Sequence, residues 1–110
     1  MDDVIVIKLA DFSKFPSGRD ETDGAHNGER FRNEVLKPAI EKASREGKYI
    51  EVSLEGVLNF GSSFFEEAFG GVIRCGILKK DQLERMLRIT PEDSRYGKYR
   101  TVIIKHIRNA

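Results

Sequence analysis

Apolar side chains follow two different spacings along this chain, and the change between them is clearest from Tyr49 to Gly76. From Ile50 to Glu55, aliphatic residues alternate with polar ones, which is typical of a strand with one covered face. After Gly61 the apolar residues recur every three or four positions as far as Ile73, as they do on one face of a helix. The segment therefore predicts a strand, a short loop and a helix.

The same two spacings predict the elements that precede this segment. Residues Val4–Leu9 form an almost continuous apolar run rich in β-branched side chains, which is typical of a strand that is central or covered on both faces. A helix is predicted from about Gly28 to Glu46, because its apolar positions fall on one stripe. Pro38 lies in the middle of this helix and is expected to bend or break it.

Toward the C-terminus the pattern predicts a helix at Lys80–Leu87 and a short strand at Leu87–Thr90. Residues 92–110 carry apolar side chains on one helical face, although residues 101–104 have a strand-like propensity. We prefer a helix here because the segment Pro91–Ser94 resembles a helix start.

The order of these elements predicts a single α/β domain that spans residues 1–110. A chain of 110 residues can bury one modest core, and the strand–helix–strand order implies at least one parallel crossover. Residues 13–28 carry Pro16 and several glycines and are expected to form a loop. A loop this long in a small domain is usually functional or mobile.

Composition and charge exclude several classes of function. The 19 basic and 18 acidic side chains leave a formal charge of +1, so nothing favours binding to nucleic acid or to an acidic membrane surface. No apolar run approaches the roughly 20 residues of a membrane-spanning helix. The single cysteine, Cys75, fits a reducing cytoplasm, and it forms no metal-ligand spacing with His26 or His106. We therefore expect a cytoplasmic protein with no metal and no cofactor.

Two serines stand where the central strand gives way to the next helix. With Ser63 as the N-cap, Glu66 takes the N3 position and completes a capping box, which contributes about 1 kcal/mol. A hydroxyl group at a helix N-terminus is also a favourable place for a phosphate. Ser63 and its neighbour Ser62 are therefore interpreted either as a simple helix cap or as a site of phosphorylation.

The same segment resembles the strand, loop and helix of STAS domains, the fold of anti-anti-sigma factors. Leu54-Glu55-Gly56-Val57 matches the middle of the STAS pattern, and Gly61-Ser62-Ser63-Phe64 falls on its Asp-Ser-Ser-Gly. The whole chain is similar to a small STAS-like family of unknown function from bacteria and phages. The segments that carry this similarity are Ser17–Arg19, Asn27–Arg32, Val35–Pro38 and Ser62–Gly71.

The resemblance implies a small STAS-like domain in which helices pack on a mixed sheet of about four strands. It also implies that Ser63 aligns with the serine that a partner kinase phosphorylates in anti-anti-sigma factors, with Ser62 beside it. The implied partner is a histidine-kinase-like ATPase, which phosphate at the docking face would release. Two positions depart from the pattern, because Gly61 replaces its aspartate and Phe64 replaces its glycine.

The residues around the serine pair are the candidates for contact with a partner protein. Exposed aromatic side chains are enriched at interaction surfaces, although most aromatic residues at this junction are expected in the core. Adjacent helical residues point about 100° apart. The neighbouring Glu66 and Glu67 are therefore not expected to converge on one substrate atom as a catalytic pair. The partner-binding candidates are Phe60, Gly61, Phe64, Glu66 and Glu67.

A second candidate site is the loop that precedes the helix at Gly28. Glycines and arginines before a helix N-terminus can bind a phosphate, and Arg19 and Arg32 are the candidate anion-binding residues. Neither a Walker motif nor a dinucleotide-binding fingerprint accompanies them.

These observations favour a non-catalytic regulatory module that binds another protein and is switched by phosphorylation of a serine. The first alternative is a module that senses a small anion or a nucleotide through the Arg19–Arg32 loop. The second alternative is an enzyme of unrecognised type, for which the order of residues offers no catalytic constellation.

Overall fold

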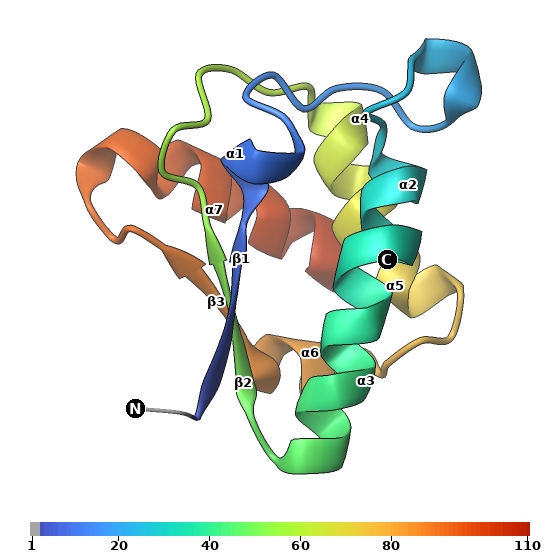
Figure 1. Ribbon diagram of the computed structural model, residues 1–110, viewed down its shortest axis with the longest axis vertical. Coiled ribbons are helices and arrows are strands. Elements are labelled where there is room, and N and C mark those ends of the chain that lie inside the picture. Colours follow the sequence, from blue (N-terminus) through green and yellow to red (C-terminus); the bar gives the residue numbers. More distant parts are fainter. Residues whose placement is uncertain (1–2) are drawn as a thin grey trace.

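The protein is built on three parallel strands. The computed structural model describes residues 3–110, apart from the side chain of Ser94. Strand β2 (Tyr49–Ser53) lies in the centre of the sheet, with β1 (Val4–Lys8) on one side and β3 (Leu87–Thr90) on the other (Figure 1). Both pairings are parallel, so each pair of strands is joined by a long crossover that carries helices.

This sheet corrects the expected one in the number and direction of its strands. Residues 3–110 contain three strands rather than about four, and the sheet is parallel rather than mixed. The physical reason is that the chain between the strands forms helices and loops. The loops that follow β1 and β2 run past each other with isolated backbone hydrogen bonds, such as Leu58 N to Lys14 O at 2.8 Å, and form no ladder.

One face of the sheet packs on helices and the other face is open. Ile50 and Val52 of β2 are fully buried, whereas the alternate row holds Val6, Glu51 and Arg88 in register. Val6 is 50% exposed. The expectation that the first strand is central or covered on both faces is therefore wrong, because β1 is an edge strand whose apolar run continues onto the open face.

The helix expected from Gly28 to Glu46 is present, and it contains a wide π-helical turn. It begins as α2 (Gly28–Phe31), widens in η2 (Arg32–Leu36) and continues as α3 (Lys37–Glu46). Pro38 lies in the first turn of α3, directly after the wide turn, where a missing backbone N–H is tolerated best. The helix therefore passes through the proline without a break.

The helix after β2 has the same three-part construction. It consists of α4 (Ser62–Phe65), the π-helical turn η3 (Glu66–Gly70) and α5 (Gly71–Arg74). Such π-helical turns are rare and are frequently found at functional sites. The two helices that carry them lie next to each other (Figure 1).

The remaining elements are two C-terminal helices and two short turns near the N-terminus. Helix α6 (Lys80–Met86) precedes β3, and α7 (Ser94–Asn109) occupies the tail, where the sequence analysis preferred a helix. The first strand ends in α1 (Leu9–Phe12), and the expected loop at residues 13–28 contains only the short turn η1 (Glu21–Asp23) before α2 begins.

Aromatic side chains join the two three-part helices in the core. Phe31, Phe64, Phe65 and Phe69 have no exposed surface. The ring centroids of Phe31 and Phe64 lie 5.6 Å apart, within the range in which aromatic pairs stabilise each other. The core therefore holds α2 against α4 and η3.

The backbones of these helices approach each other closely at Gly28. A Cβ atom on Gly28 would lie only 2.6 Å from the carbonyl oxygen of Phe64, so a larger residue would have to push α2 away from α4. Asn27 is buried just before it, and its Oδ1 accepts a hydrogen bond from the backbone N–H of Arg30 at 2.8 Å. Asn27 therefore caps α2, and the close contact requires glycine at the next position, Gly28.

Replacing Gly28 by alanine is expected to lower the free energy of unfolding by about 1–3 kcal/mol, the usual cost of overpacking a well-packed contact. The matched control is Gly97→Ala in α7, where the nearest atom beyond the adjoining helix backbone is Nη2 of Arg100, 3.9 Å from the new methyl group. The control is expected to raise stability by about 0.5–1 kcal/mol, because alanine is the better helix former. Urea unfolding of both variants measures this, and a change of the same sign in both would contradict the packing argument.

Candidate functional site

The helix at the serine pair begins two residues earlier than the capping-box prediction requires. Gly61 is the N-cap with an extended backbone, and no side chain caps the helix. The prediction that Ser63 caps the helix is therefore wrong. In a capping box the Glu66 carboxylate would accept a hydrogen bond from the backbone N–H of the N-cap residue. Here Arg19 and Arg74 hold this carboxylate instead.

The two serines differ in their surroundings. Ser62 is exposed, whereas Ser63 is partly buried. The hydroxyl Oγ of Ser62 lies 3.0 Å from Nε2 of His106, which reaches it from α7. When Nε2 carries no proton, the serine hydroxyl donates this hydrogen bond. Ser62 is therefore the accessible serine of the pair, and its hydroxyl group is hydrogen-bonded to His106 of α7.

Five charged side chains meet beside the serine pair, and we call them the charge cluster: Arg19, Arg32, Glu66, Glu67 and Arg74. Nη1 of Arg19 lies 2.5 Å from Oε1 of Glu66 and 3.6 Å from Oε1 of Glu67. Arg74 also pairs with both carboxylates, with its Nη2 at 3.2 Å from Glu66 and 3.7 Å from Glu67. The expectation that the two glutamates do not converge on one atom is therefore wrong, since Nη1 of Arg19 lies near a carboxylate oxygen of each.

Arg32 is the buried member of the charge cluster. Its side chain is only 6% exposed, and its Nη1 lies 2.6 Å from Oε2 of Glu67. The same nitrogen donates to the backbone carbonyl of Glu67 at 3.0 Å. Gly71 provides the space, because the Arg32 guanidinium lies where a Cβ atom on Gly71 would be. The prediction that Arg32 binds a free anion is not supported by this geometry, since a carboxylate of the chain already occupies it.

Arg19 and Glu66 form the exposed side of the cluster. Burial acts to raise the pKa of the Glu66 carboxyl, but hydrogen bonds from Arg19 and Arg74 outweigh it and hold the pKa below its usual value. The pKa of Arg19 is raised in turn, mainly by its hydrogen bond to Glu66. Arg19 therefore has a partner within the chain, although about half of its side chain remains accessible.

His106 connects the charge cluster to the serine pair. Burial is the main cause that lowers the pKa of His106. The nearby Glu66 acts in the opposite direction, while Lys105, Arg19 and Arg74 lower the pKa further. The neutral imidazole is therefore favoured at this position.

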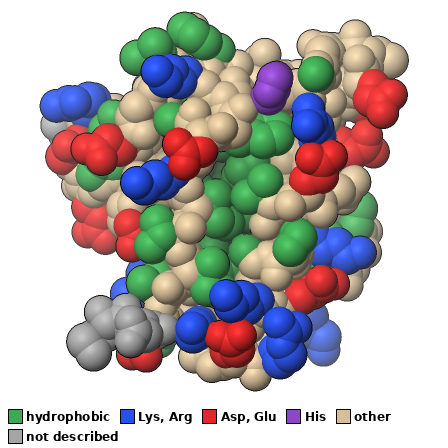
Figure 2. Space-filling model, in the orientation of Figure 1, with side chains coloured by type: hydrophobic (Ala, Val, Ile, Leu, Met, Phe, Trp, Pro, Cys, Tyr) green, Lys and Arg blue, Asp and Glu red, His purple; other side chains and the backbone are tan. Residues whose placement is uncertain are grey.

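The two loops that follow β1 and β2 form an apolar rim next to Ser62, and we call them the paired loops (residues 13–18 and 55–61). Phe15 and Leu58 are 60% and 64% exposed. The space-filling view shows hydrophobic side chains gathered at this end of the molecule (Figure 2). A hollow of about 200 Å³ opens here, and its lining includes Phe15, Phe60 and Gly61. The apolar rim thus reaches the residue that precedes Ser62.

The two aromatic candidates for partner contact have different positions. Phe60 is partly buried, with its ring 4.9 Å from that of Phe65 and 4.4 Å from that of Tyr99, and it still lines the hollow. Phe64 is fully buried in the core, so its prediction as a partner contact is wrong. The sequence analysis missed Phe15 and Leu58, whose only signal is a large apolar residue inside a polar loop.

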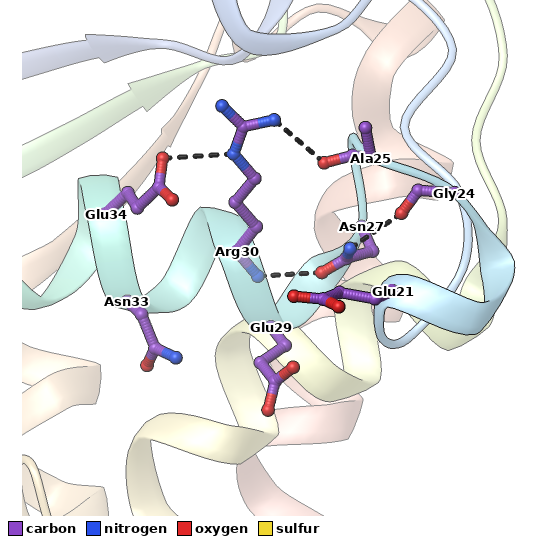
Figure 3. Close-up of a pocket in the computed structure, with 8 residues that line it drawn as sticks. All are labelled: Glu21, Gly24, Ala25, Asn27, Glu29, Arg30, Asn33 and Glu34. Atoms are coloured by element: carbon purple, nitrogen blue, oxygen red, sulfur yellow. Dashed lines mark hydrogen bonds and ion pairs between the residues drawn. The ribbon is translucent and has the colours of Figure 1, made fainter.

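The loop at Arg19–Arg32 forms a separate hollow of about 530 Å³ (Figure 3). Glu21, Glu29 and Glu34 line it, against a single arginine, Arg30, whose Nε already donates to Glu34 at 3.0 Å. Neither Arg19 nor Arg32 lines this hollow. Its acidic lining disfavours a small anion.

Two further features are absent from the described part of the chain. Within residues 3–110, no group of three or more histidine, cysteine, aspartate or glutamate side chains is arranged to hold a metal ion. None of the helices in this part of the chain has both the length and the apolar character needed to cross a membrane.

A family model described as STAS-like domain of unknown function (DUF4325) matches residues 27–90. The chain belongs to this STAS-like family. The matched segment contains both three-part helices, the buried Arg32–Glu67 pair and the serine pair. Neither the curated proteins nor the solved structures contain a significant match.

Replacing Glu67 by glutamine is expected to lower the free energy of unfolding by about 3 kcal/mol, because it removes the near counter-charge of the buried Arg32 and leaves only the Glu29 carboxylate, 4.0 Å from Nη2. This value is at the lower end of the range that is usual for breaking a buried ion pair, because Arg32 keeps its hydrogen bond to the backbone carbonyl of Glu67. The matched control is Glu34→Gln, which removes an exposed pair with Arg30 and is expected to cost under about 1 kcal/mol. Equal losses for the two variants in urea unfolding would show that the buried pair has no special role.

Stability is expected to fall below about pH 6.5, the ordinary pKa of histidine, because the pKa of His106 is lowered in the folded state. As the pH falls below 6.5, His106 takes up a proton in the unfolded chain before it does so in the folded protein. The stability that is present above pH 6.5 is therefore lost progressively, until the pH has passed the folded pKa.

NMR titration of the His106 imidazole measures its pKa directly. Ser62→Ala, which removes a hydrogen bond to the neutral ring, is expected to move it back toward 6.5. A wild-type value above 6.5 would contradict this account, and no change in the variant would show that burial and the nearby cations lower the pKa without the hydrogen bond.

Proposed function

We propose that this STAS-like protein is a non-catalytic regulatory module that binds another protein through the paired loops and the start of α4. The observation that carries the proposal is the exposure of Phe15 and Leu58 on neighbouring loops, at 60% and 64%. Exposed large apolar side chains that gather around a hollow mark interaction surfaces. Membership of the STAS-like family is consistent with such a regulatory interaction module.

The switch that we propose for this surface is phosphorylation of Ser62. The geometry favours Ser62 over Ser63 because its hydroxyl is exposed and because it follows Gly61, which lines the hollow. A phosphate would add nearly two negative charges beside the apolar rim. Arg19 and Arg74 lie near enough to influence His106, so they would attract the phosphate and compete with Glu66 for it. The charge and the bulk would then release the partner.

The proposed partner is a histidine-kinase-like ATPase. This part of the proposal rests on the resemblance to anti-anti-sigma factors, in which such a kinase modifies the serine that aligns with Ser63, next to Ser62. The apolar rim supports a protein partner of this kind over a small ligand, since the hollow beside it measures only about 200 Å³.

The contact between Ser62 and His106 also resembles a nucleophile and its base, which would suit an enzyme. A third group that orients the histidine is expected in such a site. In the described chain, however, His106 makes no other side-chain hydrogen bond. The carboxylates of Glu66 and Glu67 are occupied by arginines. These contacts support binding rather than catalysis.

The docking surface is tested with variant baits in an extract of the native host. Leu58→Asp is expected to weaken partner recovery more than tenfold, since a buried anchor in an interface contributes about 2 kcal/mol or more. Val6→Asp is the matched control, because Val6 is also a half-exposed apolar residue but lies on the open face of the sheet. Equal recovery with both variants, or equal loss, would contradict the proposed surface.

The same preparations test the switch by intact-mass analysis of the bait. A phosphate-sized increment is expected in the wild type and in Ser63→Ala, and it should be absent from Ser62→Ala. The partner should be recovered only with the unmodified fraction. An increment that persists in Ser62→Ala would overturn the choice of serine, and the absence of any modified fraction under several growth conditions would overturn the switch while leaving the docking surface in place.

A further inference from the structure

The outer edge of β1 has no neighbouring strand within residues 3–110, because β1 lies at the edge of the sheet and pairs with β2 alone. The backbone N–H of Tyr49 donates to the carbonyl oxygen of Asp3 at 2.8 Å, and this bond sets the direction of the groups that follow. In a regular strand, successive residues direct their N–H and C=O groups to opposite sides. Val4, Val6 and Lys8 therefore direct their backbone N–H groups to the outer edge.

This edge lacks the features that normally keep a free strand from pairing with another. Proteins protect exposed edges with proline, with a bulge or with charged side chains. The run from Val4 to Ile7 is β-branched throughout and stays in regular register with β2. Lys8 at its end is the only charged residue of the strand, and Val6 in its centre is 50% exposed. The edge of β1 is therefore suited to accept a further strand.

Apolar side chains form a band beside this edge, on the side of the sheet that the helices cover. The ring centroid of Phe12, which follows β1, lies 5.2 Å from that of Phe31 in α2. Val35 and Ala39 follow Phe31 in steps of four along the helix, so they lie on the same side of it. Like Ile5 of β1, they are only partly buried. The space-filling view shows hydrophobic side chains uncovered between β1 and this helix (Figures 1 and 2), so the core is incompletely covered along the edge.

We propose that β1 pairs with β1 of a second copy of this chain, antiparallel, about a two-fold axis at Val6. In this register Val6 lies opposite Val6 of the second copy, and Val4 lies opposite Lys8. The outward N–H and C=O groups of the two Val6 residues then bond to each other. Ile5 lies opposite Ile7 of the second copy on the side of the helices, where the pair covers part of the apolar band.

The charges along the strand favour this arrangement over the other ways of pairing. Asp3 precedes the strand and Lys8 ends it, and both are exposed. Antiparallel pairing brings the acidic end of one strand to the basic end of the other, whereas parallel pairing would place the two lysines side by side. The strand thus contains its own complement.

The opposite edge of the sheet is a poorer partner for β1. Strand β3 has only four residues, carries the exposed Arg88 and is followed at once by Pro91. Pairing of β1 with β3 would also leave free edges and extend without limit, whereas pairing of β1 with itself closes at two copies.

This interface is separate from the docking surface proposed above. None of its residues belongs to the serine pair, the charge cluster or the paired loops. Each copy keeps its own docking surface, so the failure of either proposal leaves the other in place.

Amide hydrogen exchange of the full chain, followed by ¹⁵N NMR and compared with sedimentation at the same concentrations, tests the pairing. The Val6 amide should exchange slowly wherever sedimentation gives the mass of two copies. Where dilution gives the mass of one copy, the amide should exchange at least about tenfold faster, because its hydrogen bond is lost. The amides of Ile5 and Ile7 point toward β2, so they should stay protected in both states and serve as the internal control.

Val6→Lys places two positive charges against each other at the axis and is expected to weaken the pair at least about tenfold. Val6 is half-exposed, so the variant should fold, which continued protection of the Ile5 and Ile7 amides would show. Leu58→Lys is the matched control. It makes the same change at an exposed apolar residue of the paired loops and should leave the pair intact.

A single copy at every concentration would overturn the proposal, and so would two copies in which the Val6 amide stays unprotected. Loss of the pair in Leu58→Lys but not in Val6→Lys would assign the self-association to the apolar rim instead. Growth beyond two copies would overturn the two-fold arrangement, because a pair that joins the two β1 edges is closed.

Discussion

The buried guanidinium of Arg32 is the constraint on which the arrangement of the helices depends. A charge that is only 6% exposed needs a counter-charge and further hydrogen bonds. Glu67 supplies both, through its carboxylate and its backbone carbonyl. Arg32 lies in the π-helical turn η2 and Glu67 lies in the π-helical turn η3. The pair therefore fixes one irregular turn against the other, and Gly28 and Gly71 provide the close approach that it requires.

The rest of the candidate site follows from this contact. Once Glu67 faces Arg32, its neighbour Glu66 is directed toward Arg19 and Arg74. Arg19 belongs to the long loop after β1, so its ion pair attaches that loop to the helix that starts at Ser62. The two loops then run side by side, and their apolar side chains are presented at one end of the molecule (Figure 2). The position of the exposed rim thus depends on a charge pair in the interior.

Sequence periodicity predicted the elements well where one pattern dominates, as in β2 and in the helix from Gly28 to Glu46. It failed for β1, because an unbroken apolar run does not show which face is open. The charge cluster could not be predicted, since its partners are separated by 35 and 47 residues and only the fold brings them together. The cap at Ser63 was wrong for the same reason, because a distant arginine competes for the carboxylate that the local motif needs.

The distribution of paired and unpaired groups supports a binding surface over a carboxylate-based catalytic site. Acid–base catalysis needs a group that is free to exchange a proton with a substrate, yet the clustered glutamates are already paired with arginines. The groups that remain available near the serine pair are a hydroxyl and two apolar side chains on loops. Such groups can be modified or covered by another protein. In the proposed arrangement the charges hold the surface in place, and the uncharged side chains are the ones that would contact the partner protein.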